Sequence, residues 1–317
     1  MLKLHLDTDL GGDIDDLCAM AMLLHWPEVE LLAVTTVLDD GGRRAGYARY
    51  ALRVAGREDV VVAAGADVSL GCYRPTPGFP DEDAYWPEPI PPAPGPLDEA
   101  LDLLERSIEQ GAIIAAIGPY TNLALLEKRS PGILGRAQLY LMGGYVFPPR
   151  EGFPPWGNDM DWNVQVDAPS ALHVIQRSDP TFVPLSVTVE TWVRRAYLSP
   201  LRQGGPLSRL LARQAEAFAD EEGYEAKYGK TCLGLPADAI NFLHDPLACA
   251  IALGWNEGVE IQEIPLRSEI QEGRLWQRVE ESGKPTRVVT RVDGEKFSEF
   301  WLDTVARGNP VAPTSRA

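Results

Sequence analysis

The 317-residue chain is 45% hydrophobic and carries 46 acidic against 29 basic side chains, for a formal net charge of −17. Its length and composition suffice for a large buried core, and the acidic balance argues against the basic face that proteins present to nucleic-acid phosphates. An uncharged or cationic small molecule fits this charge better. No run is apolar enough to span a bilayer, and the chain enters a strand pattern at once, so we expect a cytoplasmic protein.

Strand patterns alternate with one-faced helical patterns from the N-terminus to about residue 185. We predict strands at residues 2–6, 30–37, 60–64, 113–117, 138–142 and 182–185. We predict helices at residues 15–24, 45–54, 97–109, 122–128 and 168–176. This alternation is typical of an α/β fold with an open, mostly parallel sheet flanked by helices, and we expect one domain over residues 1–317.

From about residue 194 the pattern predicts a helical C-terminal part, with helices at 245–253 and 294–305 and late strands at 259–264 and 287–292. Residues 71–95 are rich in proline and have no period, which predicts a long loop that is either a functional lid or a plain surface excursion. We expect residues 308–317 to be disordered. The four scattered cysteines form no CxxC pair, so they indicate small buried side chains and not a zinc or disulfide framework.

The N-terminal string DTDLGGDIDD places acids around a glycine turn between the first strand and the first helix: Asp7, Asp9, Asp13, Asp15 and Asp16. Five carboxylates at the carboxyl end of a strand repel one another unless a cation lies among them. Oxygen ligands without a nearby histidine favour calcium or magnesium over zinc. One or two of these acids could serve only as helix caps, and Asp13 alone could be a turn residue, but capping does not need five.

This string resembles the signature of the inosine-uridine-preferring nucleoside hydrolase family, whose shorter form is DxDxGxDD. Further segments resemble the family in the same order along the chain: LLAVTTVLDD, VVAAGAD, AIGPYTNLALL, LMGG, MDWNVQVDAPSA and HDPLACA. The resemblance implies a nucleoside hydrolase-like fold and calcium-dependent hydrolysis of the bond between ribose and base. It also implies a homodimer or homotetramer.

By this resemblance, calcium is held by Asp9, Asp16, Asp245 and the main-chain carbonyl of Thr121. Asp9 is also the general base, which takes a proton from a water that the metal activates. His244 corresponds to the histidine that assists the leaving base, although a histidine at a helix start can equally be a structural hydrogen-bonding group.

The resemblance assigns ribose hydroxyls to Asp15, Asn163 and Asp161, with Asn158 as a weaker candidate. Asp161 stands where the family usually has glutamate, so its side chain is one methylene shorter. Asp40, in an Asp-Asp pair that replaces a frequent Gly-Asn pair, substitutes a charge for a neutral amide contact to the substrate.

Aromatic side chains in two segments are candidates for contact with the base. Tyr85 and Trp86, in the proline-rich loop, could stack on a base or simply pack the loop. Phe218, Tyr224 and Tyr228 could close over the base or face inward from an amphipathic helix.

Two other functions fit parts of the pattern. A haloacid dehalogenase-type phosphohydrolase would use Asp7 as a nucleophile with magnesium, but the lysine that such chemistry needs before a later acid pair does not stand out. A catalytically inactive ligand-binding relative on the same fold is the second alternative.

Overall fold

The structure is a computed structural model that describes residues 1–71 and 79–307. Within this part, nine strands form one sheet in the order β10-β9-β11-β6-β5-β4-β1-β2-β3. The six strands from β6 to β3 run parallel, β11 joins β6 in parallel, and β9 and β10 continue antiparallel. The strands are β1 Leu2–Thr8, β2 Val29–Thr36, β3 Val61–Ala64, β4 Ile113–Ala116, β5 Gln138–Met142, β6 Thr181–Val183, β9 Glu260–Gln271, β10 Arg274–Val279 and β11 Lys284–Arg291.

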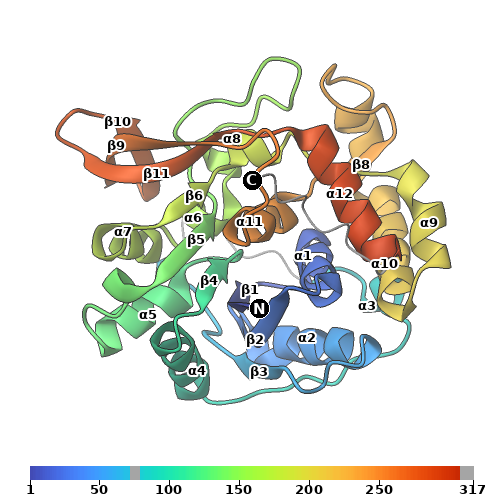
Figure 1. Cartoon of the computed structure of the whole chain (residues 1–317), viewed down its shortest axis with the longest axis horizontal. Coiled ribbons are helices and arrows are strands. Elements are labelled where there is room, and N and C mark those ends of the chain that lie inside the picture. The colour runs from blue at the N-terminus through green and yellow to red at the C-terminus, as the bar shows by residue number, and fades with distance from the viewer. Residues whose placement is uncertain (72–78, 308–317) are drawn as a thin grey trace.

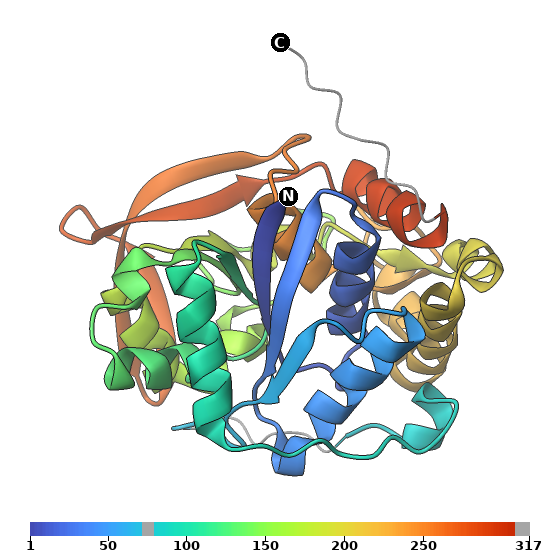
Figure 2. The ribbon, with the colours of Figure 1, turned by 60° about the horizontal axis from the view of Figure 1, so that its bottom comes forward.

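Helices cover both faces of this sheet, with α4 and α5 on one side of β1 and β2 and α1 and α2 on the other (Figure 2). Strands covered on both faces are buried along most of their length, as β4 is at every position. The α-helices are α1 Asp15–His25, α2 Arg43–Val54, α3 Glu82–Tyr85, α4 Leu97–Glu109, α5 Thr121–Arg129, α6 Trp162–Gln165, α7 Ala168–Arg177, α8 Leu185–Thr188, α9 Leu198–Gln203, α10 Pro206–Glu222, α11 His244–Ala252 and α12 Gly294–Arg307. Thus the predicted α/β fold with an open, mostly parallel sheet is confirmed.

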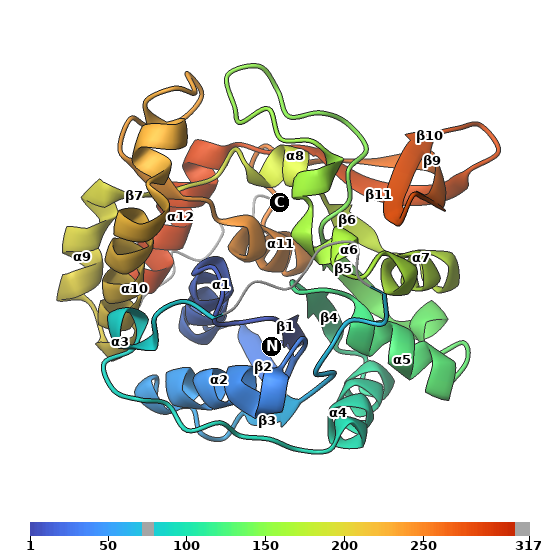
Figure 3. The same cartoon turned by 180° about the vertical axis from the view of Figure 1, so that it is seen from behind.

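Several predicted boundaries are corrected by the structure. The strand predicted at residues 182–185 is β6 and ends at Val183, because Pro184 breaks it and α8 begins at Leu185. The C-terminal part is helical but also contains the long hairpin of β9 and β10, which extends beyond the body of the molecule (Figures 1 and 3). A small second sheet pairs β7 Val193–Arg194 with β8 Ala239–Asn241.

The described part of the predicted proline-rich loop packs against α2 and α10. Residues 72–78 of this loop lie outside the described part of the chain, as does the tail 308–317 that was predicted to be disordered. The remainder contains α3, and Trp86 stacks on Tyr47 with ring centroids 4.5 Å apart. Arg213 of α10 donates hydrogen bonds to the main-chain carbonyls of Asp83 and Ala84, and these bonds hold α3 against α10.

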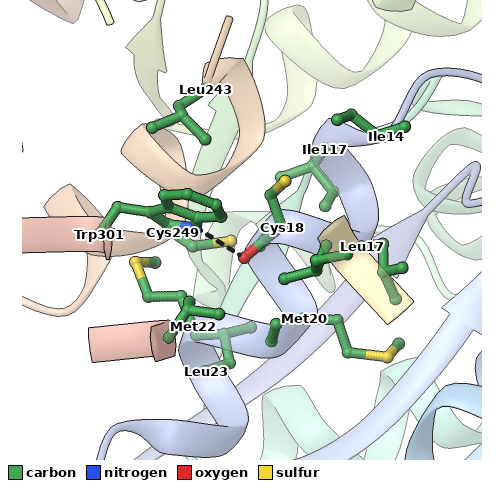
Figure 4. Close-up of a cluster of buried hydrophobic side chains, with 14 of the residues drawn as sticks. Ile14, Leu17, Cys18, Met20, Met22, Leu23, Ile117, Leu243, Cys249 and Trp301 are labelled. Carbon is green, nitrogen blue, oxygen red and sulfur yellow. Dashed lines mark hydrogen bonds between the residues drawn. The ribbon is translucent and has the colours of Figure 1, made fainter. Parts of the chain in front are cut away.

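Helix α1 lies in the middle of the core, between α11 and α12 (Figure 1). Figure 4 shows Trp301 of α12, which is fully buried, donating from its indole to the carbonyl of Cys18 at 3.1 Å. Cys18 and Cys249 are buried here as thiols, as predicted, and Cys232 is half-buried. Because α1 is held on all sides, the acids at its first turn have fixed positions.

Candidate active site

The carboxyl end of β1 and the first turns of α1 and α11 bring acids from distant parts of the sequence together. Oxygens of Asp15, Asp16 and Asp245 lie within 4.8 Å of one another, and all three side chains are buried. Asp15 and Asp16 begin α1, and Asp245 is the second residue of α11, which packs against α1. Both helices therefore direct their N-terminal N–H groups towards the carboxylates, which favours negative charge there.

Asp9 lies beside this group at the end of β1. Its Oδ2 accepts a hydrogen bond from the Trp162 indole at 3.1 Å. Asp16 is held by the hydroxyl of Thr8, which donates to its Oδ1. Asp9 is thus oriented by a tryptophan that the sequence did not single out.

The electrostatics of these acids favour a bound cation. Burial, followed by the repulsion of neighbouring carboxylates, raises the pKa of Asp15, Asp16 and Asp245 well above its usual value. Burial also raises the pKa of Asp9, against the opposing influence of Arg44. A divalent cation offsets both the burial and the repulsion, and an all-oxygen donor set suits a hard ion such as calcium or magnesium. The residues present therefore fit a metal centre.

Two of the predicted residues lie at neighbouring strand ends of the same edge. Thr121 is the first residue of α5, just beyond β4, and its hydroxyl donates to Asp167 at 2.6 Å. The amide of Asn163 donates to the carbonyls of Ile117 at 2.7 Å and Met142 at 3.2 Å, which follow β4 and end β5. Since β4 is hydrogen-bonded to both β1 and β5, these residues share the sheet edge with Asp9.

Asp161 and Asn158 are engaged in contacts that support the loop after β5. Asp161 accepts from the main-chain N–H of Gly144 at 2.7 Å and caps α6, and burial raises its pKa to about 7. The amide of Asn158 donates to the carbonyl of Leu275 at 2.8 Å and accepts from Gln165 at 3.0 Å. Both side chains are fixed by the protein itself, so their first role is to hold the loop in place.

The two residues of the Asp-Asp pair after β2 lie in different surroundings: Asp39 is buried and Asp40 is exposed. Asp39 is fully buried and accepts from the hydroxyl of Thr36 at 2.7 Å and from the N–H groups of Arg44 and Ala45 at the start of α2. Asp40 is exposed at the start of a 3-10 turn, Asp40–Gly42. Asp39 is therefore occupied by the start of α2, and the contact of Asp40 with the substrate stays a prediction.

His244 is buried at the first position of α11, with Nδ1 2.7 Å from the hydroxyl of Thr188. Burial lowers its pKa to about 3, so the imidazole is neutral. Phe242 and Trp156 flank it, with ring centroids 5.4 and 6.0 Å from the imidazole. The sequence had given no reason to select either ring.

These rings belong to an aromatic cluster next to the acids, formed by Trp156, Tyr224, Tyr228, Phe242 and His244. The Trp156 indole donates to the Tyr228 hydroxyl at 3.2 Å. Burial and then the charge of Asp13 raise the pKa of Tyr224. Asp13 in turn accepts from Asn241 at 2.6 Å, so it is more than a turn residue.

The aromatics predicted in the proline-rich loop have other partners. Trp86 packs on Tyr47, and the hydroxyl of Tyr85 donates to Glu221 at 2.7 Å. Both side chains are buried. Of the two readings of this pair, loop packing is therefore the one that the structure supports.

Asp7, the nucleophile of the phosphohydrolase alternative, is inaccessible. It is fully buried, and its Oδ1 accepts from Thr35 at 2.5 Å and from Asn122 at 2.8 Å. A nucleophile must reach its substrate, so this geometry does not favour that alternative.

The sequence profile of the family described as inosine-uridine preferring nucleoside hydrolase matches residues 4–299. The chain belongs to this family. The predicted family and the predicted enzyme class are thereby confirmed. The chain is 29% identical over 306 residues to the pyrimidine-specific ribonucleoside hydrolase RihA of Salmonella paratyphi A, a match that covers 92% of this chain and 88% of that protein. An uncharacterised protein of Schizosaccharomyces pombe is 29% identical over 341 residues, covering 96% and 99% of the two chains.

Solved structures with the same fold include a plant nucleoside hydrolase, PpNRh1, at a TM-score of 0.78 and 21% identity, covering 98% of this chain and 99% of that one. A purine-preferring ribonucleoside hydrolase from Gardnerella vaginalis superposes with a TM-score of 0.74 at 22% identity, covering 98% and 100%. None of the helices in residues 1–71 and 79–307 has the length and apolar character needed to cross a bilayer.

Proposed function

We propose that the protein hydrolyses the N-glycosidic bond of ribonucleosides in a calcium-dependent reaction that yields ribose and the free base. The observation that carries this proposal is the buried group of Asp15, Asp16 and Asp245 with Asp9 beside it, adjoining an aromatic cluster. The carboxylates suit a cation and a polar sugar, and the aromatic rings suit a planar base.

The metal ligands would be Asp9, Asp16, Asp245 and the carbonyl of Thr121. Calcium, when bound, would hold the ribose diol and make a water more acidic. Oxygens of Asp15, Asp16 and Asp245 lie within 4.8 Å of one another, so Asp15 would bind either a ribose hydroxyl or the cation itself.

The protein's own side chains would position the sugar and move the protons. Asp9, held through Oδ2 by Trp162, would accept a proton from the attacking water. Asn163 would orient a ribose hydroxyl, with Asp161 and Asn158 fixing α6, the short helix from which it projects. The carboxylates would also stabilise the positive charge that develops on the ribose as the base departs.

His244 would assist the leaving base. If its Nδ1 accepts a hydrogen bond from the hydroxyl of Thr188, the N–H of the neutral imidazole lies on Nε2 and can donate a hydrogen bond to the departing base, which would take its proton from water. Trp156, Phe242, Tyr224 and Tyr228 would surround the base, and a tyrosine hydroxyl would be the donor if the histidine is not.

The test is ribose release from a panel of uridine, cytidine, inosine, adenosine and guanosine with the calcium-loaded protein. Relatives named for pyrimidine and for purine nucleosides make both kinds of base necessary in the panel. We expect Asp9→Asn to lower the rate about 10²–10⁴-fold on the best substrate. Asp98→Asn, which changes an exposed acid on α4, is the matched control and should leave the rate unchanged.

Absence of ribose release from every nucleoside, or an unchanged rate in Asp9→Asn, contradicts the proposal. Hydrolysis of p-nitrophenyl phosphate that Asp7→Asn abolishes would instead support a phosphohydrolase. The homodimer or homotetramer stays a prediction, which light scattering of the purified protein tests.

A further inference from the structure

A buried arginine lies directly behind the catalytic turn. Arg44, on α2, is only 7% exposed, and among the described residues it is the one lysine or arginine in the buried class. Within that same part of the chain it forms no ion pair. A buried guanidinium without a direct ion pair is costly, so its hydrogen bonds and the nearby charges of Asp9 and Asp16 must account for its position.

Those hydrogen bonds all go to main-chain carbonyls of the two loops that frame the acids. Nε donates to the carbonyl of Leu38 at 2.8 Å, and Nη1 donates to the carbonyls of Asp9 and of Leu10, the latter at 3.1 Å. The ring of Phe79 lies 4.9 Å from the guanidinium carbon. One planar fork therefore ties the turn after β1 to the turn after β2.

Local structure fixes the arginine in this orientation. Asp39 accepts from the N–H groups of Arg44 and Ala45, which sets where α2 begins. Leu38 has a positive φ of 50°, so its carbonyl is turned by an uncommon backbone conformation. On the other side, a Cβ on Gly11 would lie 2.5 Å from Tyr47, so the turn after Asp9 is pressed against α2.

We infer that Arg44 is a positioning residue whose guanidinium fork fixes the main chain at Asp9 and Leu10, and so aims the Asp9 carboxylate at the metal and the substrate. This inference rests on the proposed function. Trp162 holds the side chain of Asp9 and Arg44 holds its backbone, so the two contacts together leave the carboxylate little freedom.

The positive charge of Arg44 and its positioning role predict opposite changes in calcium affinity when Arg44 is removed. A cation near Asp9 and Asp16 repels a second cation, so charge alone would make the protein bind calcium more tightly when Arg44 is removed. Positioning predicts weaker binding after removal, because the ligands lose their fixed geometry. The sign of the change therefore distinguishes the two roles.

The experiment compares wild type, Arg44→Lys and Arg44→Gln by calcium titration calorimetry and by steady-state kinetics on the best nucleoside. Lysine keeps the charge but cannot form the three-carbonyl fork. We expect both variants to lose about 10- to 100-fold in calcium affinity and in kcat, with KM changed less than about threefold. Arg49→Gln is the control, since Arg49 is an exposed residue of the same helix that donates to one carbonyl, Val62, away from the acids.

Wild-type affinity and kcat in Arg44→Lys, or tighter calcium binding by Arg44→Gln, would overturn the positioning role and leave only a charge effect. Circular dichroism shows whether each variant folds, and Arg44→Lys alone decides the outcome if the glutamine variant does not. A wild-type protein that releases no ribose refutes the proposed function, and calorimetry then judges Arg44 separately. A wild-type protein that binds no calcium overturns both.

Discussion

Thr35, on β2, connects two buried titratable groups, Asp7 and His5. Thr35→Val should measure how much this connection contributes to the free energy of unfolding. Its hydroxyl donates to Asp7 Oδ1 at 2.5 Å and lies 2.9 Å from His5 Nε2, whose Nδ1 is 2.8 Å from the Ser107 hydroxyl. His5, Asp7 and Thr35 have no exposed surface. Valine has nearly the same shape, so the substitution removes the hydrogen bonds without opening a large cavity.

The magnitude follows from the two groups that lose a partner. A buried polar group that loses its hydrogen-bond partner costs about 1–3 kcal/mol, and a hydrogen bond to a carboxylate is at the upper end of this range. We therefore expect Thr35→Val to lower the free energy of unfolding by about 3–5 kcal/mol in all. At about 2–4 °C per kcal/mol for a large domain, Tm should fall by about 6–20 °C.

The same substitution should act through pH. Burial raises the pKa of Asp7 to about 7, against the hydrogen bonds from Thr35 and Asn122, which lower it. Removing Thr35's hydroxyl raises it further. Since a folded pKa above the unfolded value favours the protonated folded state, the destabilisation should be larger at about pH 8 than at about pH 6.

Urea denaturation measures the loss, with Thr290→Val as the matched control. Thr290 is a half-buried residue of β11 whose hydroxyl donates to the carbonyl of Glu260 at 3.3 Å. We expect this control to change stability by less than about 1 kcal/mol. If Thr35→Val costs no more than Thr290→Val, the buried network does not contribute as the structure indicates.

Three further outcomes are expected. Chelation with EGTA should abolish ribose release and lower Tm, with calcium restoring both; full activity in calcium-free protein contradicts the metal centre. In calcium-free protein, Tm should rise as the pH is lowered from about 8 to about 6. Burial raises the pKa of Asp161 to about 7, and burial with mutual repulsion raises the pKa of Asp15, Asp16 and Asp245 well above the usual range, so folding favours the protonated forms. A falling Tm over this pH range refutes the argument. His244→Ala should cost about 10²–10⁴ in kcat on nucleosides but leave p-nitrophenyl riboside nearly unaffected; equal losses would assign His244 a structural role beside Asp245.

The parallel part of the fold could be predicted because its strands are buried on both faces and its helices on one. Each predicted strand from β1 to β5 lies within two residues of the observed one at both ends. The hairpin of β9 and β10 was harder to predict from the sequence, because β9 is largely exposed and lacks an apolar run. Its two-residue turn has Glu272 and Gly273 at positive φ. Asn-Gly and Asp-Gly are the dipeptides that predict such a turn strongly, and Glu-Gly predicts it only weakly.

The acids of the site could be predicted because most of them lie within ten residues of one another at one strand end. Asp245 needed the family resemblance, since nothing local to α11 connects it to α1. The contacts of Asp161 and Asn158 could not be foreseen, because Asn158 bonds to Leu275, 117 residues away. Arg44 was missed for a different reason: a pair of arginines at a helix start indicates an exposed face, and only the cap by Asp39 turns one of them inward.

The aromatic cluster shows why the base is the least predictable part of the substrate. Its members come from the loop after β5, from Tyr224 and the π-helical turn Glu225–Gly229 that follows it, and from the segment that joins β8 to the first residue of α11. Each ring alone fits loop packing as well as base contact, and Trp86 indeed packs on Tyr47. Under the proposed function, ribose recognition would depend on acids and an amide held at one edge of the sheet, whereas base recognition would depend on how three separate loops pack together. Substitutions in those loops can therefore change the preferred base while the acids, and the chemistry that they support, stay the same.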